Sequence, residues 1–284
     1  MVMIHVQPPY DFTRVCERLA NDPLIRIHHN EITVPLYVNE KPLLACVKSV
    51  GTKEKPAFVV SCDEEQHKDE VIARLSRIFH WDRPLAFIHH HFIQTNLRDV
   101  FIAHEGTPLV LEFDLYFCLM KCIIHQQIHM KVAHRLTERF VHTFGERLGD
   151  VYIYPRPERV ANASYDELRA LSLSERKAQY IVDISRLIVE GKLRLEEMHS
   201  LSDEEVTKQL LSIRGIGPWT VQNFLLFGLG RPNVFPKGDV GLQRAIERTF
   251  QLDHRPTMKE MDAFQRMWEP YASYAALYLW RSIE

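Results

Sequence analysis

Two glycines and a proline interrupt a helix-forming run in this chain, and no other feature restricts its fold as strongly. Residues 210–220 read LLSIRGIGPWT. Proline is preorganised for the first position of a helix, where its missing N–H leaves nothing unsatisfied. Glycine permits backbone conformations and close approaches that a Cβ would block. We therefore expect two short helices joined by a hairpin at Gly215-Ile216-Gly217, whose outward-facing amides at a helix N-terminus can bind a phosphate.

A single carboxylate, Asp239, follows this hairpin at the start of another expected helix. It stands after Gly238 in the run FPKGDV at residues 235–240. Aspartate is a common helix N-cap and contributes about 1 kcal/mol there, so capping alone accounts for its presence. A helix N-terminus also favours an ionised carboxylate. The sequence therefore leaves two roles open for Asp239, a structural cap and a reactive anion, and both can hold together.

The composition is that of an ordinary globular protein. Of the 284 residues, 46% are hydrophobic and 25% are charged, which is typical of a folded chain with a proper core. No apolar run approaches the roughly 20 residues that span a bilayer, and the N-terminus lacks the pattern of a secretory signal. The five cysteines are scattered, as expected for reduced thiols in the cytoplasm. We expect Cys118 and Cys122, four apart on an apolar helix face, to be small core residues rather than metal ligands.

The net charge of −2 does not exclude a nucleic-acid partner, although phosphate contacts normally supply much of the affinity. A local basic rim steers DNA even when acidic surface elsewhere cancels the total. Basic residues in or near the hairpin and the neighbouring motifs are Arg176, Lys177, Arg214, Arg231, Lys237 and Arg244. A charge-mixed solvated surface also explains any one of them.

The first 85 residues predict a mixed sheet domain. Short β-rich runs bounded by turn residues occupy residues 24–28, 32–38, 43–47 and 57–61. Residues 11–19 and 66–79 have helical patterns. Residues 81–108 form a transition, in which we expect His89, His90 and His91 to alternate faces in an extended segment without forming a metal site.

From Asp114 onward nearly every segment has helical period. We expect helices at residues 115–143 (one long helix or two joined ones), 165–171, 174–190, 202–210, 220–227, 240–250 and 258–283. Ser174 has the pattern of an N-cap, and residues 202–205 have that of a capping box. The predicted fold class is therefore α+β, with an N-terminal α/β-sheet domain over residues 1–85 and an all-α region over residues 86–284.

An ordered set of motifs in the helical region resembles the helix-hairpin-helix DNA glycosylases (the HhH-GPD superfamily), and among them the DNA-3-methyladenine glycosylase II type. The set comprises IIHQQI at 123–128, SERKA at 174–178, the hairpin, Gly238-Asp239, and WEPYASYA at 268–275. In that family the hairpin grips the DNA backbone and an aspartate shortly downstream serves base excision. The resemblance implies a catalytic cleft between helical subdomains. Because no nucleotide, zinc or flavin signature is present, we expect no organic cofactor.

The implied activity is excision of alkylated purines, such as 3-methyladenine and 7-methylguanine, from double-stranded DNA in base excision repair. Such an enzyme rotates the nucleotide out of the duplex before it breaks the N-glycosidic bond. Asp239 would stabilise the oxocarbenium-like sugar and assist the attack of water. Strand-cleaving relatives carry a lysine just after the hairpin, where this chain has Trp219, and an indole cannot form a Schiff base. The resemblance therefore implies a monofunctional glycosylase.

Trp219 and Trp280 match aromatic residues of the family's base pocket. A cationic base over an indole face gains roughly 0.5–2 kcal/mol. The alternative role of each is that of an ordinary core residue. Asn223, Val240 and Arg281 stand where the best-known relative has aromatic residues, so the pocket is expected to be less aromatic and the range of lesions stays open.

Further contacts with DNA are expected from Gly215, Gly217, Arg214, Thr220, Gln126, Gln127, Lys237 and Arg244. Gln127 stands where the family places the residue that fills the gap left by the flipped base, and a solvated glutamine on a helix is the alternative. His125 and His129 have a spacing that suits a metal, but no third ligand is evident. The resemblance also implies a monovalent cation held by backbone carbonyls between Ser212 and Gly217, with no side-chain metal site.

Two other functions remain open at this stage. The first is an oxidised-base glycosylase with lyase activity, for which Lys237 is the substitute nucleophile we can name. The second is a non-catalytic module that binds distorted DNA. We expect a monomer, since neither a coiled-coil heptad nor an obvious interface can be recognised.

Overall fold

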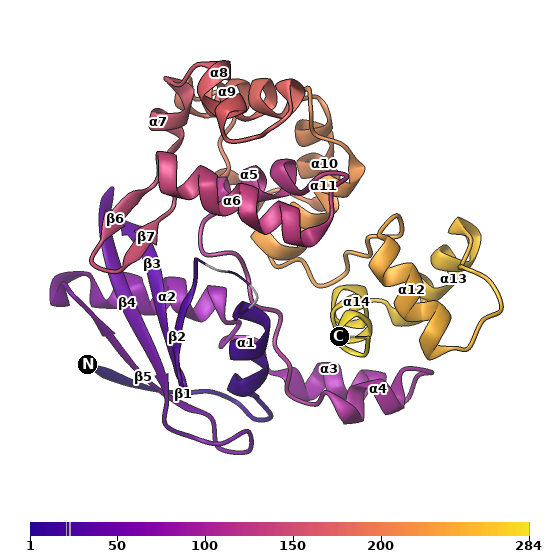
Figure 1. Ribbon diagram of the computed structural model, residues 1–284. Coiled ribbons are helices and arrows are strands. Elements are labelled where there is room, and N and C mark those ends of the chain that lie inside the picture. The colour runs from indigo at the N-terminus through magenta and orange to yellow at the C-terminus, as the bar shows by residue number, and fades with distance from the viewer. Residues whose placement is uncertain (21, 23, 284) are drawn as a thin grey trace.

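A five-stranded antiparallel sheet forms the N-terminal part of the molecule (Figure 1). The computed structural model describes residues 1–20, 22 and 24–283. The strands lie in the order β1-β5-β4-β3-β2, with bounds Val2–His5 (β1), Arg26–His28 (β2), Glu31–Val38 (β3), Lys41–Ser49 (β4) and Ala57–Cys62 (β5). The accompanying helical elements are α1 (Phe12–Leu19), the 3-10 turn η1 (Glu65–His67) and α2 (Lys68–Ile78). The expected strands and helices are confirmed, and β1 is an addition.

Local sequence sets the geometry of this sheet. Val38 pairs with Lys41, so Asn39 and Glu40 alone connect β3 to β4. Their φ angles are +48° and +64°, as the two central residues of a type I′ hairpin turn require. At the start of α1, Asp11 accepts a hydrogen bond from the backbone N–H of Thr13 at 3.0 Å and caps the helix. The helix expected from residue 11 therefore begins at Phe12.

A layer of helices lies above the sheet in Figure 1. Its elements are α5 (Leu115–His125), α6 (Met130–Phe144), α7 (Pro157–Ala161), α8 (Tyr165–Ala170), α9 (Glu175–Val189), η2 (Glu196–Ser200), α10 (Asp203–Leu211), α11 (Pro218–Asn223) and the π-helical turn η3 (Phe224–Gly228). Helix α5 is the core of this layer, because nine of its eleven residues are buried. Gly228 brings η3 against α5, where a Cβ would lie 3.3 Å from the Sγ of Cys118. Cys118 and Cys122 are buried and free, as expected.

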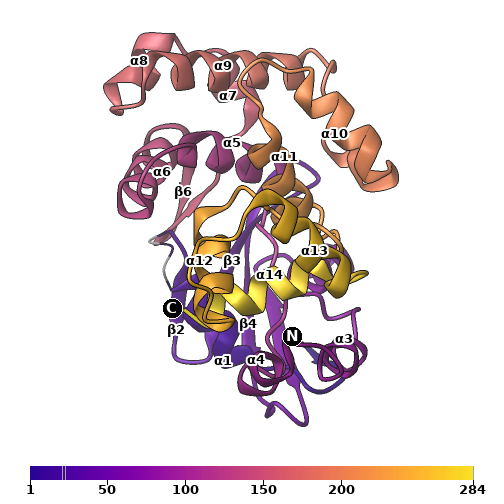
Figure 2. The ribbon, with the colours of Figure 1, turned by 90° about the vertical axis from the view of Figure 1, so that its right-hand side faces the viewer.

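The C-terminal helices form a second group with helices that precede α5. The group comprises α3 (Leu85–Phe92), α4 (Arg98–Ala103), α12 (Val240–Thr249), α13 (Met258–Trp268) and α14 (Ala272–Arg281). The rings of Phe92, Phe101 and Tyr278 stack in one column with centroid separations of 4.0 and 3.9 Å. Figure 2 shows α12–α14 between the α8–α10 layer and helices α3 and α4.

Two expected elements differ in the structure, and an open alternative is decided. Residues 115–143 form two joined helices, because Gln126, with a ψ of 126°, and Gln127, with a φ of +54°, leave the helical path. Residues 258–283 are also divided, between α13 and α14, where Pro270 lacks the N–H that a continuous helix needs. The expected extended segment at His89–His91 was wrong, since these residues lie in α3.

The helical region also contains a small hairpin that the sequence analysis missed. Strands β6 (Glu146–Leu148) and β7 (Val151–Ile153) pair antiparallel, and both contact the N-terminal sheet through β4 and β3. Gly149 has a φ of +60° in the connecting turn, a conformation that favours glycine. Strands of three residues are too short to show the alternation of apolar and polar side chains by which a strand is recognised in a sequence. The region after residue 114 is therefore helical with one β-hairpin, and the boundary at residue 85 stays a prediction.

No helix among the described residues is long and apolar enough to cross a membrane. The capping signals are confirmed. Ser174 accepts a hydrogen bond from the N–H of Lys177, and Ser202 with Glu205 forms a capping box.

A buried ion pair connects the N-terminal part to α5. The Nζ of Lys121 lies 2.9 Å from Asp22 Oδ2 and 3.0 Å from Glu112 Oε1, and all three side chains are less than 20% exposed. Burial alone would raise the pKa of Asp22, but the attraction of Lys121 outweighs it and holds that pKa below its usual value. Burial would likewise lower the pKa of Lys121, but Glu112 and Asp22 raise it. Asp22 and Lys121 are therefore both charged at neutral pH.

Replacement of Lys121 by methionine is expected to lower the free energy of unfolding by about 3–5 kcal/mol, because it leaves two buried carboxylates without their cation. Since the pKa of Asp22 is lower in the folded state, the stabilisation is present above about pH 4 and is lost as the pH falls. Urea unfolding at pH 7 and at about pH 2 measures both effects. Lys131→Met, at an exposed position, is the control, and equal stability of the two variants at pH 7 would contradict the prediction.

Candidate active site

Asp239 is the N-cap of α12, and its side chain is partly exposed. Its Oδ1 accepts a hydrogen bond from the backbone N–H of Leu242 at 2.8 Å, which confirms the N-cap. The same oxygen accepts a second hydrogen bond, at 3.0 Å, from the indole N–H of Trp280 on α14. Both donors converge on Oδ1, so the carboxylate is fixed by two separate helices.

Gly241 makes this arrangement possible. A Cβ at residue 241 would lie 3.0 Å from Asp239 Oδ1 and 3.5 Å from Trp280 Nε1. Any larger residue would press on the hydrogen bond between them. No local sequence pattern marks Gly241, because the need for a glycine arises from Trp280, a residue 39 positions later.

Trp280, Phe227 and Arg18 lie against one another in a row. The ring of Phe227 in η3 stacks on Trp280 with a centroid separation of 6.1 Å and an interplanar angle of 28°. The guanidinium carbon of Arg18, on α1, lies 4.6 Å from the centre of the Phe227 ring. Phe227 and Arg18 were both missed, because no local pattern in the sequence connects α1 to residues beyond 220. The N-terminal part of the chain therefore reaches the neighbourhood of Asp239.

The hairpin is tightly packed at its first glycine. Gly215 has a φ of +95°, and a Cβ there would lie 2.3 Å from Cγ of Tyr180 on α9. The guanidinium of exposed Arg214 lies 5.7 Å from the centre of the same ring. Gly217 differs, since its φ is −108° and a Cβ there would meet nothing within 4 Å. The expected need for glycine is therefore confirmed within the fold at Gly215, and a close approach of DNA to Gly217 stays a prediction.

Gln126 joins the end of α5 to the hairpin. Its Nε2 donates to the carbonyl oxygen of Gly215 and to the hydroxyl of Thr220, both at 2.9 Å. The Nζ of Lys177 donates to the carbonyls of Ile124 and Gln126 at 2.7 and 2.8 Å, and burial lowers the pKa of this lysine. The side chains of Gln126, Thr220 and Lys177 therefore support the hairpin from within, and their contact with DNA stays a prediction.

The second helix of the hairpin begins as predicted, with Gly217 as N-cap and Pro218 at its first position. The N–H groups of Trp219 and Thr220 belong to the first turn, where no carbonyl of the preceding turn can accept them. Trp219 is half-buried, and its carbonyl accepts a hydrogen bond from Asn223 at 2.8 Å. Asn223 thus turns back to its own helix.

Some of the other residues expected to contact DNA are exposed, and others are engaged in contacts within the protein. Gln127 and Arg244 are exposed. Lys237 instead forms an ion pair with Asp262, and this hydrogen bond lowers the pKa of Asp262. Arg231 is also engaged internally, because its Nη2 donates to the carbonyls of Met198, His199 and Leu201. The basic rim therefore contains fewer available cations than the sequence suggests.

The histidine pair does not form a metal site. His125 Nε2 lies 3.0 Å from Thr137 Oγ1, and burial lowers the pKa of His125 to about 3. His129 instead caps α6. Within the described ranges, no group of three His, Cys, Asp or Glu residues could hold a metal ion. In the hairpin, the carbonyls of Ile213 and Gly215 already accept protein hydrogen bonds, so the expected monovalent cation would depend on other carbonyls of the turn.

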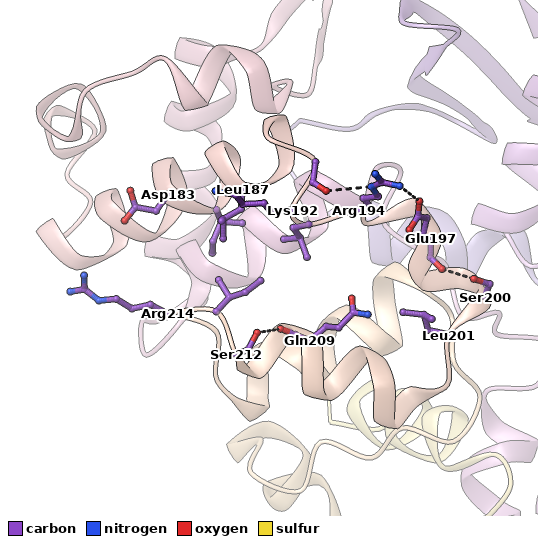
Figure 3. Close-up of a pocket in the computed structure, with 14 residues that line it drawn as sticks. Asp183, Leu187, Lys192, Arg194, Glu197, Ser200, Leu201, Gln209, Ser212 and Arg214 are labelled. Atoms are coloured by element: carbon purple, nitrogen blue, oxygen red, sulfur yellow. Dashed lines mark hydrogen bonds and ion pairs between the residues drawn. The ribbon is translucent and has the colours of Figure 1, made fainter.

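A pocket of about 830 Å³ lies beside the hairpin, on the side of α9 and α10 (Figure 3). Leu187, Leu193 and Ile213 contribute apolar lining, and Arg194 and Arg214 contribute charge. Its lining includes neither Asp239 nor the two tryptophans. The expected cleft between helical subdomains stays a prediction.

Comparison with known proteins gives consistent results. Residues 120–270 match the model of the HhH-GPD superfamily base excision DNA repair proteins. A putative DNA-3-methyladenine glycosylase, YfjP of Bacillus subtilis, is 49% identical over 284 residues, which cover 99% of this chain and 98% of the relative. A 3-methyladenine DNA glycosylase from Archaeoglobus fulgidus has a similar structure, with a TM-score of 0.89 at 23% identity over 99% of this chain and 97% of that one. Schizosaccharomyces pombe Mag1, a 3-methyladenine DNA glycosylase in complex with abasic DNA, has a TM-score of 0.61 at 27% identity over 69% of this chain and 94% of that one.

The class of protein follows from these similarities and from the hairpin, which is followed by the helix-capping carboxylate of Asp239. It is a DNA-binding enzyme that hydrolyses N-glycosidic bonds. The chain belongs to the HhH-GPD superfamily of base excision DNA repair proteins.

Substitutions at the two hairpin glycines are expected to have different effects, one on stability and the other on DNA binding. Gly215→Ala should lower the free energy of unfolding by about 2–5 kcal/mol, because it combines a strained φ with a clash against Tyr180. Gly217→Ala should fold normally but weaken binding, since its methyl group would stand beside the outward-facing amides. Urea unfolding and fluorescence anisotropy with an abasic duplex measure the two effects. Wild-type affinity of folded Gly217→Ala would show that no phosphate approaches this residue.

Proposed function

We propose that this protein is a monofunctional DNA glycosylase that excises alkylated purines, among them 3-methyladenine and 7-methylguanine, in base excision repair. The observation that carries the proposal is the carboxylate of Asp239, held by two donors on one oxygen and next to an indole ring. The names of the similar proteins from Bacillus subtilis and Archaeoglobus fulgidus support the alkylated-base substrate.

In the proposed reaction the damaged nucleotide is rotated out of the duplex. The bond between C1′ and the purine nitrogen breaks, and the bonding electron pair leaves with the base. The carboxylate of Asp239 stabilises the positive charge that develops on the sugar. Water then adds to C1′ and transfers a proton to the carboxylate, which releases it to solvent. The products are a free base and an abasic site, and no organic cofactor is required.

Two observations favour simple hydrolysis over strand cleavage through a Schiff base. The residue just after the hairpin proline is Trp219, whose indole has no nucleophilic amine. The substitute nucleophile, Lys237, forms an ion pair with Asp262, so its amine is engaged by that carboxylate and is not positioned to attack a sugar.

The proposal includes the partner and setting of the enzyme. The hairpin amides contact a phosphate of double-stranded DNA, with a monovalent cation bound by carbonyls of the turn. The enzyme acts as a monomer in the cytoplasm, where its five cysteines, all free in the structure, stay reduced. Gln127 is exposed and has a positive φ at the break between α5 and α6, which supports its role in filling the gap left by the flipped base.

Asp239→Asn is expected to lower the single-turnover rate of base release by about 100-fold or more, because an amide cannot stabilise the developing cation. Asparagine also caps helices, so folding and affinity for abasic DNA should be unchanged. Release of 3-methyladenine and 7-methylguanine from methylated duplex DNA measures the rate. Asp253→Asn, at an exposed position beyond α12, is the control. Base release at the wild-type rate by Asp239→Asn would contradict the proposed mechanism. A covalent adduct between the protein and DNA, trapped by borohydride, would support the lyase function instead.

Trp280→Phe is expected to slow base release by about 10-fold or more while the protein stays folded. The substitution keeps an aromatic ring but removes the N–H that holds Oδ1 of Asp239, and hydrogen bonds to charged groups contribute about 1.5–3 kcal/mol. The rate at saturating enzyme measures the effect. Trp268→Phe removes an indole N–H that donates to Asn96 instead of Asp239 and serves as the control. If Trp280→Phe retains the wild-type rate, Trp280 acts through its ring alone.

A further inference from the structure

Arg231 connects the helices that build the hairpin to the helices that hold Asp239. The sequence places this arginine in a basic rim, but its side chain is only 23% exposed and lies against the backbone of the protein. Its Nε lies 3.1 Å from Oδ1 of Asp203. Its Nη2 donates to three carbonyls just before α10, at 3.0, 3.4 and 2.6 Å, which belong to Met198, His199 and Leu201.

These contacts hold together the two ends of the segment that contains the hairpin. From Leu201 the chain runs through α10, the hairpin, α11 and η3 before it reaches Arg231. The hydrogen bond between these two residues therefore spans 30 positions of the chain. The backbone N–H of Arg231 also donates to the carbonyl of Leu225 in η3, at 2.9 Å. One residue thus fixes the start and the end of the hairpin segment.

The backbone of Arg231 is bonded to α14. The hydroxyl of Ser273, which is fully buried, donates to the carbonyl of Arg231 at 2.6 Å and accepts from the N–H of Val234 at 2.8 Å. About two helical turns further along α14, Trp280 donates its hydrogen bond to Asp239. A continuous set of contacts therefore leads from the start of α10 through Arg231 and α14 to the carboxylate.

The segment that follows η3 is also held from the N-terminal part of the chain. Arg83 donates to the carbonyl of Gly230 at 2.8 Å. Gly230 has a φ of +66°, and a Cβ there would lie 2.7 Å from Nε2 of His80. The backbone next to Arg231 therefore has little room to shift.

The proposed reaction needs this rigidity, because the enzyme must bind a phosphate and a sugar of the same DNA at once. The phosphate lies on the hairpin amides, and the sugar lies beside Asp239. Helices α12 and α14, which hold Asp239, lie below α11 in both Figure 1 and Figure 2. The DNA fixes the separation of its own phosphate and sugar, so the protein must present its two sites at a matching distance. An error of about 1 Å in such an alignment lowers a rate by about 100-fold.

We propose that Arg231 is a positioning residue, which sets the hairpin at the distance from Asp239 that the damaged strand requires. This inference rests on the proposed glycosylase function and adds to it a residue that acts on the rate of base release without contact with DNA. The alternative is the role that the sequence suggests, a direct contact between Arg231 and a phosphate.

The test compares the wild type with Arg231→Met and Arg231→Lys. Single-turnover release of 7-methylguanine from methylated duplex, at saturating enzyme, is expected to fall by about tenfold or more in Arg231→Met. Affinity for undamaged duplex and its dependence on salt should be unchanged, because the hairpin amides remain and no phosphate contact is lost. Lysine keeps the charge and can donate to part of the carbonyl set, so Arg231→Lys should release the base at an intermediate rate.

Arg186→Met is the matched control. The Nε of Arg186 donates to the carbonyl of Ala161 at 3.1 Å, and its Nη1 lies 3.6 Å from Asp183. The substitution removes the same kinds of contact, but these connect α9 to the end of α7 and do not lead to Asp239. Its rate of release should equal that of the wild type. Thermal melting of each variant defines a temperature at which all are folded.

Three outcomes would contradict the inference and leave the glycosylase intact. The first is release at the wild-type rate by folded Arg231→Met. The second is weaker binding by Arg231→Met with a flatter dependence on salt, which would identify Arg231 as a phosphate contact. The third is an equal fall in rate in Arg186→Met, which would assign the effect to a general loss of packing. Failure of the wild type to release any base would instead contradict the proposed function, and the inference with it.

Discussion

The two hydrogen bonds that Asp239 accepts on one oxygen are the interaction on which the site depends. The backbone of α12 supplies one donor and the indole of Trp280 on α14 supplies the other. Gly241 keeps the space between them open. A carboxylate fixed in this way does not need to reorganise when positive charge appears beside it, and preorganised groups of this kind supply much of the electrostatic part of catalysis. Its second oxygen can then face a sugar.

The hairpin that would hold the DNA depends on a different set of contacts, which come from α5 and α9. Gln126 bonds to Gly215 and Thr220, Lys177 holds the end of α5, and Tyr180 packs against the hairpin backbone. These are structural contacts made by residues that a motif search would assign to DNA binding. A helix-terminal carbonyl without Lys177 would lack a buried partner, which costs about 1–3 kcal/mol. The contacts that support the DNA-binding hairpin and the hydrogen bonds that hold the catalytic carboxylate therefore form two separate networks.

Features with a local cause were predictable from the sequence. Ser174, Ser202 and Asp239 were recognised as caps because the pattern of capping spans only three or four residues, and the conformation of Gly215 follows from the need to end one helix and begin another. Features with a distant cause were not. Phe227 and Arg18 meet across more than 200 residues, Gly241 is explained only by Trp280, and Gln126 turns inward only because the hairpin lies against it. The division of residues 115–143 at Gln127 was left open, since amphipathic period continues across the break.

The central claim is that the hairpin sets the carboxylate at residue 239 beside the sugar of an extruded purine. The most direct measurement is a crystal structure of Asp239→Asn bound to duplex DNA that carries an alkylated purine. We expect a backbone phosphate on the amides of the first turn of α11 and a side-chain oxygen of residue 239 about 3–3.5 Å from C1′ of a flipped nucleotide. A complex in which the DNA lies on another surface, or in which residue 239 is remote from the sugar, would contradict the claim.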